Sequence, residues 1–130
     1  MRLYLDSVTI IYLIEKVSVY LEKINFILSN NSEFCTSQLS NLECKVKPRK
    51  ENNLALLTDY NYFLNEFINI YCPINTEVLE VALEIRAKYN FKTPDSIHLA
   101  TAIYCKCDSF ITNDKRLGIF QDLKIITLDS

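Results

Sequence analysis

Short apolar segments alternate with longer amphipathic ones along this chain, and this alternation constrains the fold more than any other feature. The short segments are consecutive apolar or β-branched residues typical of buried strands, whereas apolar residues in the longer segments recur at helical spacing. The predicted strands are Leu3–Leu5, Glu33–Thr36, Ile70–Ile74, Ser109–Thr112 and Lys124–Leu128. Strands separated by helices favour crossover connections, so the pattern predicts one α/β domain over residues 1–130 with a mostly parallel sheet.

The predicted helices occupy the intervals between the strands. The first helix starts at Ser7 as its cap, the second covers Val19–Leu28, and the third runs from Ser37 or Ser40 to Pro48. The fourth runs from Lys50 through Ile68. The fifth starts at a Thr76 cap, and the sixth starts at Thr93 with Pro94 in its first turn. The last helix is apolar on most sides, which predicts that it is deeply buried.

Composition excludes several classes of protein. The apolar fraction of 49% excludes intrinsic disorder, and one Gly with three Pro excludes collagen-like and low-complexity chains. No apolar run approaches the ~20 residues of a membrane span, and an acid as early as Asp6 argues against a signal peptide. With 16 acids against 14 bases, the net charge of −2 gives no overall attraction for nucleic acid or membranes. A polyanion would therefore have to be handled at a local site.

Five cysteines bear on the compartment: Cys35, Cys44, Cys72, Cys105 and Cys107. The count is odd, and the chain has no CxxC motif and one histidine, which argues against a disulfide framework or a zinc site. The sequence predicts free thiols in a reducing cytosol.

Two acids directly follow predicted strands. Asp6 comes after the first strand, and Asp114 comes shortly after the fourth. Open parallel sheets bind ligands beyond the carboxyl ends of their strands, at a switch in strand order. If the first and fourth strands are neighbours, Asp6 and Asp114 lie side by side at such a switch. Taken alone, each acid is also an ordinary turn or capping residue.

Two further acids lie on predicted helices. Asp95 is in the first turn of the buried helix, where a carboxylate also favours the helix dipole. Glu43 lies among Leu39, Leu42 and Val46, where burial of a lone carboxylate would be unfavourable, although most helical glutamates are solvated. The four acids together, rather than any one of them, predict a site.

Four segments resemble the PIN-domain ribonuclease family, and within it the VapC-like toxins. They are LYLDS at Leu3–Ser7, SQLSNLE at Ser37–Glu43 with Pro48 following, TPDSIHLATA at Thr93–Ala102, and FITND at Phe110–Asp114. The third and fourth segments are the more specific, and the set covers nearly the whole chain. The resemblance implies a PIN-like fold with strand order 3-2-1-4-5.

The resemblance also implies an activity, that of a metal-dependent endoribonuclease. It makes Asp6, Asp95 and Asp114 metal-binding carboxylates, and Glu43 a fourth catalytic acid that binds metal or positions water. Thr112 resembles the family's hydroxyl residue near the metal, and Ser7 is either a helix cap or a neighbour of the site. Oxygen-only ligands suit Mg²⁺, with Mn²⁺ as a substitute. The implied role is the toxin of a toxin–antitoxin pair, which acts on RNA in the cytoplasm. Such a toxin has a cognate antitoxin as its partner and often forms a homodimer.

A basic run follows Glu43 and consists of Lys45, Lys47, Arg49 and Lys50. It is either a solvated helix end or a rim that contacts RNA phosphates without reading sequence. The only histidine, His98, lies three residues after Asp95 on the same helical face, and a satisfied core position is the prediction for it.

One departure from the family pattern keeps an alternative open. Some relatives have a further acid just after the position of Asp114, where this chain has Lys115 and Arg116. A complete second metal site is therefore in question, and the alternative is a PIN-fold RNA- or protein-binding module with an incomplete, inactive site. A haloacid-dehalogenase-type phosphatase would need a second Asp two residues after Asp6, where this chain has Val8.

Overall fold

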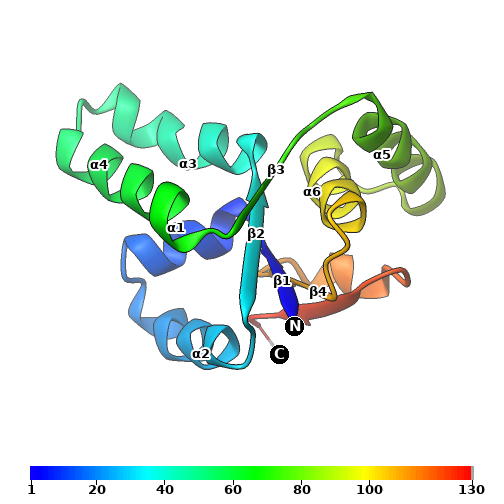
Figure 1. Cartoon of the computed structure of the whole chain (residues 1–130), viewed down its shortest axis with the longest axis horizontal. Coiled ribbons are helices and arrows are strands. Elements are labelled where there is room, and N and C mark those ends of the chain that lie inside the picture. Colours follow the sequence, from blue (N-terminus) through cyan, green and yellow to red (C-terminus); the bar gives the residue numbers. More distant parts are fainter. Residues whose placement is uncertain (130) are drawn as a thin grey trace.

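The computed structural model describes residues 1–129 and has a central sheet of five strands. All the strand pairs are parallel, in the order β3-β2-β1-β4-β5, so the predicted α/β class and the implied strand order are both confirmed (Figure 1). The strands are β1 (Arg2–Leu5), β2 (Glu33–Ser37), β3 (Ile70–Cys72), β4 (Ser109–Thr112) and β5 (Lys124–Thr127). The switch in strand order falls at β1, which pairs with β2 on one side and β4 on the other.

Helices cover both faces of the sheet (Figure 1). One face packs against α1 (Ser7–Ile14), α2 (Ser18–Ser29), α3 (Gln38–Lys50), α4 (Leu54–Tyr62) and the π-helical turn η1 (Phe63–Phe67). The other face packs against α5 (Thr76–Tyr89), α6 (Thr93–Tyr104) and the 3₁₀ turn η2 (Lys115–Ile119). The sheet therefore separates two hydrophobic cores.

The central strand shows how alternation builds both cores. Leu3 and Leu5 point into the core under α1–α4, and Tyr4 points into the core under α5 and α6. All three side chains are fully buried. Because successive side chains point to opposite faces, one continuous apolar strand supplies both layers, as parallel sheets covered on both sides require.

Helix starts differ from the sequence prediction by one residue. Asp6, rather than Ser7, caps α1, because its carboxylate accepts the Thr9 backbone N–H at 2.9 Å. Asn75, rather than Thr76, caps α5 by accepting the Val78 N–H at 3.0 Å. Acidic and amide side chains at the preceding position reach the free N–H groups of the first turn. At α6, Lys92 occupies the cap position and makes no side-chain capping bond.

The segment after Glu43 also departs from the prediction. The third helix continues past Pro48 and ends at Lys50, so Pro48 does not close it. Pro48 lies in the last turn, where its missing N–H removes only one helical hydrogen bond. The single helix predicted from Lys50 through Ile68 is instead α4 followed by η1, and Asn53 caps α4 through the Leu56 N–H at 3.1 Å.

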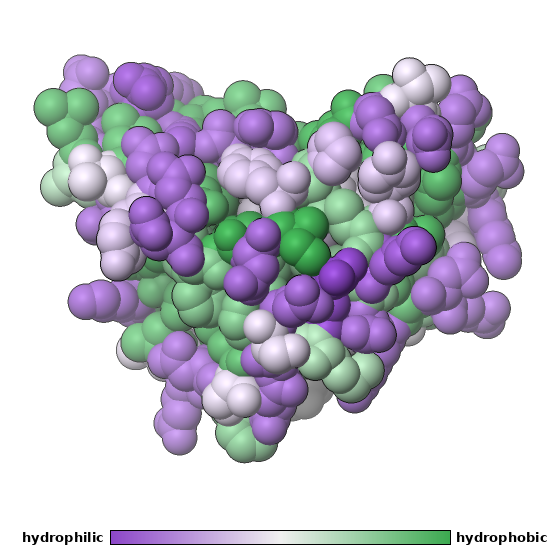
Figure 2. Space-filling view, viewed as in Figure 1, coloured by the Kyte–Doolittle hydropathy of each residue, from purple (hydrophilic) through white to green (hydrophobic). Residues whose placement is uncertain are grey.

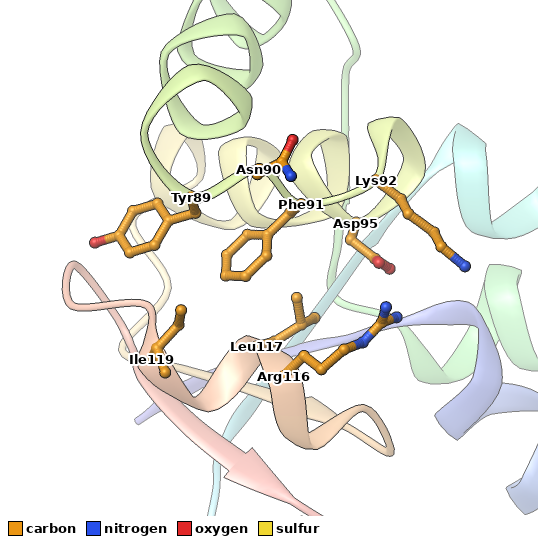
Figure 3. Close-up of a pocket in the computed structure, with 8 residues that line it drawn as sticks. All are labelled: Tyr89, Asn90, Phe91, Lys92, Asp95, Arg116, Leu117 and Ile119. Atoms are coloured by element: carbon orange, nitrogen blue, oxygen red, sulfur yellow. The ribbon is translucent and has the colours of Figure 1, made fainter.

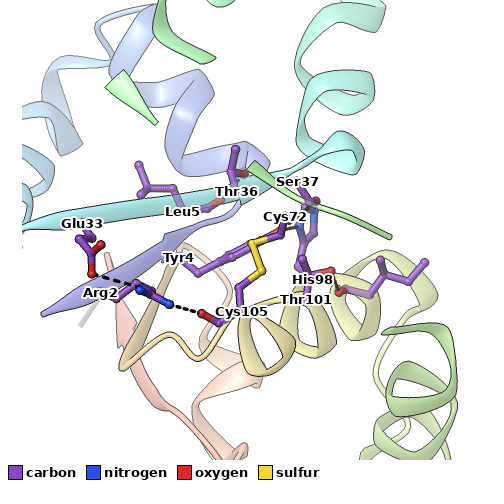
Figure 4. The surroundings of a disulfide bond; sticks show 11 residues. Arg2, Tyr4, Leu5, Glu33, Thr36, Ser37, Cys72, His98, Thr101 and Cys105 are labelled. Carbon is purple, nitrogen blue, oxygen red and sulfur yellow. Dashed lines mark hydrogen bonds and ion pairs between the residues drawn. A yellow bond between two sulfur atoms is a disulfide. The ribbon is translucent and has the colours of Figure 1, made fainter. Parts of the chain in front are cut away.

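Cys72 and Cys105 form a disulfide between β3 and the end of α6, so the prediction of free thiols is wrong for this pair (Figure 4). Their Cα atoms are 6.4 Å apart although the residues are 33 apart in sequence. Sequence spacing carried no signal for a contact that the sheet and helix layers create. Cys35, Cys44 and Cys107 are free, as predicted, and the structure buries all three. Within residues 1–129, no helix has both the length and the apolar character needed to cross a membrane.

Candidate functional site

The candidate site lies where β1 and β4 end side by side. Leu5 of β1 is in register with Ile111 of β4, so the next residues, Asp6 and Thr112, are neighbours at the switch in strand order. The outline of the molecule is notched between its two helical layers at this edge, above the carboxyl ends of the strands (Figure 2). This is the place where open parallel sheets bind ligands.

Asp6 is a buried carboxylate. Burial raises its pKa, opposed by hydrogen bonds from the Thr112 hydroxyl and the Thr9 backbone N–H. No Lys, Arg or His nitrogen of residues 1–129 forms an ion pair with it. Asp6 is therefore a site where a cation would relieve an unfavourable buried charge.

Asp114 is held by its own chain. Its carboxylate caps η2 by accepting the Arg116 N–H at 2.9 Å, and it binds the Arg116 guanidinium through Nε at 3.0 Å and Nη2 at 2.5 Å. The hydrogen bonds from Arg116 lower the pKa of Asp114. Its backbone N–H donates to the Thr112 hydroxyl at 3.1 Å, which places Thr112 between Asp114 and Asp6.

Asp95 comes to the same place from the first turn of α6. Its carboxylate is half-buried, and burial followed by the charge of Asp114 raises its pKa. Asp6, Asp95 and Asp114 line one hollow of about 550 Å³ together with Thr112. The structure thus brings three of the four predicted acids to one opening from three separate elements.

These side chains fit a hard cation that takes few protein ligands. As they stand, no group of three or more His, Cys, Asp or Glu side chains in residues 1–129 is gathered closely enough to hold a metal ion. Asp6 is turned onto the Thr9 N–H and Asp114 onto Arg116. The donors are nevertheless all oxygens, and Mg²⁺ binds through one or two carboxylates while keeping several waters. Asp6 and Asp95, whose pKa values are raised, are therefore the two carboxylates best suited to bind the cation.

Glu43 is outside the lining of this hollow. Its Oε1 accepts a hydrogen bond from His98 Nε2 at 2.7 Å, and the His98 Nδ1 atom lies 2.8 Å from the Tyr4 hydroxyl. Although burial raises the pKa of Glu43, bonding to His98 and to the Ser7 hydroxyl brings it below its ordinary value. Ser7 therefore lies beside Glu43, and it is the first residue of α1 rather than its cap.

His98 is buried with both ring nitrogens bonded, as the sequence prediction of a satisfied core histidine has it. That prediction missed the partner, because it contained no link between His98 and Glu43. The spacing of three residues puts His98 on the same face of α6 as Asp95, which points towards the site but not to Glu43. The sequence shows Arg116 only as a departure from the family pattern and does not predict its ion pair with Asp114.

The basic run does not line the hollow. Lys47, Arg49 and Lys50 are exposed in the last turn of α3, and Lys45 donates to the side-chain oxygen of Asn61 on α4. Cations at a helix C-terminus also complement the helix dipole. Their role toward RNA stays a prediction.

Comparison with known proteins gives one family and several similar structures. The profile of the PIN domain family matches residues 3–124. No curated protein matches the chain significantly. A structure of VapBC2 from Rickettsia felis bound to a promoter DNA fragment is similar with a TM-score of 0.79 at 16% identity, covering 98% of both chains. FitAcB from Neisseria gonorrhoeae is similar with a TM-score of 0.73 at 16% identity, covering 97% of both chains.

A third similar structure is VapC20 from Mycobacterium tuberculosis, described as a toxin that cleaves the sarcin–ricin loop. Its TM-score is 0.69 at 12% identity, and the match covers 94% of this chain and 98% of that one. Identities this low show likeness of fold, and the position of the acids in the fold has to carry any argument about chemistry.

Proposed function

This chain belongs to the PIN domain family, and we propose that it is a Mg²⁺-dependent endoribonuclease that hydrolyses RNA phosphodiester bonds, with Mn²⁺ able to substitute. One observation carries the proposal: Asp6, Asp95 and Asp114 reach one hollow at the carboxyl ends of parallel strands. Two of these carboxylates have raised pKa values and no ion pair within residues 1–129.

In this proposal Asp6, Asp95 and Asp114 hold the cation. When bound, a divalent ion supplies a water of lowered pKa and neutralises charge on the phosphate. Thr112 keeps the Asp6 carboxylate in place through its hydroxyl. Asp114 contributes fully only when Arg116 gives up part of its hold, because the guanidinium now binds both carboxylate oxygens.

Glu43 is the fourth catalytic acid of the proposal. Its lowered pKa keeps it ionised at neutral pH, so it can accept a hydrogen bond from the attacking water. His98 orients Oε1, and the Tyr4 hydroxyl, which also bonds the Ser37 hydroxyl at 3.0 Å, holds the imidazole ring. Ser7 supports the carboxylate from α1.

RNA as the substrate, and a toxin role, draw on the similar structures. VapC20 is described as a toxin that cleaves the sarcin–ricin loop, and a toxin–antitoxin complex from Klebsiella pneumoniae is also similar in fold. We therefore propose that a cognate antitoxin covers this site, that the chain forms a homodimer, and that it acts in the cytoplasm. The exposed cations Lys47, Arg49 and Lys50, with Lys45, would contact RNA phosphates.

A second candidate function is a PIN-fold module that binds RNA or protein without cleaving. The observation that favours it is the Asp114–Arg116 ion pair, because Arg116 already neutralises one of the three acids of the hollow. This module would bind RNA equally well with and without metal and would have no hydrolytic activity.

Cleavage of a fluorescent RNA in Mn²⁺ or Mg²⁺ separates the two functions. We expect wild-type protein to cleave in a metal-dependent way, and Asp95→Asn to lose at least about a hundredfold in rate, as loss of a catalytic electrostatic group does. Asp122→Asn is the matched control, because Asp122 is exposed and outside the hollow. Equal rates for Asp95→Asn and wild type, or no cleavage at any metal concentration, would overturn the enzyme proposal.

A further inference from the structure

A second, smaller hollow of about 210 Å³ adjoins the carboxylate hollow. The two share Asp95 and Arg116. The smaller one lies between the turn that joins α5 to α6 and the 3₁₀ turn η2 (Figure 3). Nothing in the proposed hydrolysis uses this space, although it opens onto the acids that carry the reaction.

The two ends of this hollow differ in character. Tyr89 and Phe91 line one side and face Leu117 and Ile119 across the gap, so this end is apolar (Figure 3). Phe91 and Leu117 are nearly buried, so Tyr89 and Ile119 supply most of the accessible surface at this end. The Tyr89 and Phe91 rings are stacked with centroids 5.1 Å apart. Ile119 is 64% exposed, so its side chain is accessible to a ligand at this end.

The other end carries two cations, Lys92 and Arg116, beside Asp95 (Figure 3). Arg116 binds Asp114 through Nε and Nη2, and its Nη1 forms no hydrogen bond within residues 1–129. One edge of the guanidinium is therefore available to an anion. Lys92 is exposed, and its charge reaches Asp114, where it helps to lower the pKa.

The walls are held in place by the chain itself. Asn90 ends α5 in the left-handed conformation, with φ of 59°, and its N–H donates to the Arg86 carbonyl at 2.9 Å. Arg86 Nη1 donates to the Phe91 carbonyl at 2.6 Å, and the Gln121 N–H donates to the Tyr89 hydroxyl at 3.3 Å. A hollow braced in this way is preorganised, so a ligand would not pay for ordering it.

We propose that this hollow binds the base of a single RNA nucleotide next to the scissile phosphate, with Lys92 and Arg116 on the adjoining phosphates. The inference rests on the proposed ribonuclease function and adds a substrate subsite to it. A nucleotide joins a flat apolar base to an anionic backbone, which matches an apolar end next to two cations. The volume lies below the ~300 Å³ at which drug-sized pockets begin, so it suits one base rather than several.

Binding of short RNA in EDTA tests this subsite without relying on cleavage. The probes are a pool of fluorescein-labelled random tetraribonucleotides and an abasic tetramer with the same backbone. Wild-type protein should bind the pool about tenfold more tightly than the abasic probe, a difference of about 1.4 kcal/mol, because only the pool has a base to bury at the apolar end. Fluorescence anisotropy at low salt measures both dissociation constants.

Ile119→Glu should abolish that preference, because it places a charge at the apolar end. Val19→Glu on α2 is the matched control, since Val19 is also an exposed aliphatic residue and lies away from the hollow. Lys92→Gln should weaken binding of both probes by a similar factor and keep the preference. Ile119→Ser serves as a second variant if Ile119→Glu does not fold.

The outcomes for the subsite and for the nuclease are separate. A wild type with no preference for bases, or an Ile119 variant with the same preference as Val19→Glu, would overturn the subsite even if RNA is cleaved. Failure of metal-dependent cleavage would overturn the nuclease and leave the measured base preference standing as evidence for the subsite.

Discussion

Glu43 and Asp114 each bind a basic side chain of this chain, whereas Asp6 and Asp95 bind none within residues 1–129. His98 and Arg116 help to lower the pKa values of the first two acids, and burial raises those of the second two. The four carboxylates of the proposed site thus fall into two pairs with opposite pKa shifts. The difference indicates which acids are satisfied by the fold itself and which gain from an external cation.

The Glu43–His98 and Asp114–Arg116 pairs also differ from each other. The His98 side chain is buried, and its second nitrogen is bonded to Tyr4. Arg116 is mostly exposed, and its pair with Asp114 faces solvent. A buried pair fixes its acid, whereas an exposed pair is weak and can exchange for another ligand. Glu43 is therefore a fixed acid and Asp114 an exchangeable one.

Replacing His98 should have the largest effect on stability. His98→Ala removes one hydrogen-bond partner each from the partly buried Glu43 carboxylate and the buried Tyr4 hydroxyl, so we expect a loss of about 3 kcal/mol in the free energy of unfolding. Urea denaturation at pH 7 measures it. Arg116→Ala is the comparison and should lose less than about 1 kcal/mol, as exposed ion pairs do. Equal losses would show that the two pairs are equivalent.

Divalent metal should act through the acids that have no ion pair. At Mn²⁺ a hundredfold above its dissociation constant, the wild type should gain about 2.7 kcal/mol of stability, which raises its melting temperature. Asp95→Asn should gain less at the same concentration, because one ligand of the proposed pair is lost. Thermal melts with and without Mn²⁺ measure both gains. A melting temperature that ignores metal in both proteins would contradict a metal site.

In EDTA, Asp95→Asn and Asp114→Asn should shift the melting temperature in opposite directions. Because its pKa is raised in the folded state, Asp95 contributes to the free energy of unfolding below its ordinary pKa of about 4. This contribution is lost as the pH rises through the raised value. Asn has no such loss, so Asp95→Asn should melt a few degrees higher than the wild type at pH 7.

The effect of Asp114 on stability has the opposite pH dependence. Its lowered pKa contributes stability above the ordinary value, and that stability is lost as the pH falls through the lowered value. Asp114→Asn should therefore melt slightly lower than the wild type at pH 7. Both differences should shrink as the pH falls below about 4, where Asp is increasingly protonated. Melts from pH 3 to 8 measure this, and shifts of the same sign at pH 7 would refute the contrast.

Arg116→Gln should change stability least. It should nevertheless clearly change the response of the melting temperature to metal. This variant removes the guanidinium from Asp114 and so converts the exchangeable acid into one without an ion pair. The Mn²⁺-induced rise in melting temperature should become larger than in the wild type. Lys124→Gln, an exposed cation on β5, is the control for loss of one positive charge. An unchanged metal response would mean that Arg116 does not compete with the cation.

Much of the fold could be predicted because its signals are local. The strands Leu3–Leu5 and Ser109–Thr112 are apolar runs, and the start of α6 is marked by Thr93 and Pro94. The strand order came from the family resemblance of four segments and is confirmed. The boundaries after Pro48 could not be predicted, because Pro is tolerated near a helix end, and the π-helical turn has no sequence signature of its own.

The candidate site also has parts that could be predicted from local signals and parts that could not. Placing Asp6 and Asp114 at the ends of neighbouring strands needed only the strand positions and the strand order. The Cys72–Cys105 disulfide and the Glu43–His98 pair could not be predicted, because each joins residues from different layers, 33 and 55 positions apart. Such contacts depend on the distance between helices across the sheet, which no local pattern encodes.

By itself, the sequence determined an α/β domain whose acids follow its strands and begin its buried helix, because periodicity and residue type act over a few neighbouring positions. The tertiary structure alone decided which acids have a basic partner of their own. It buried His98 between Tyr4 and Glu43, turned Arg116 back onto Asp114, and left Asp6 and Asp95 without an ion pair among residues 1–129. Charge balance depends on distance and burial in space, and those exist only once the layers have packed.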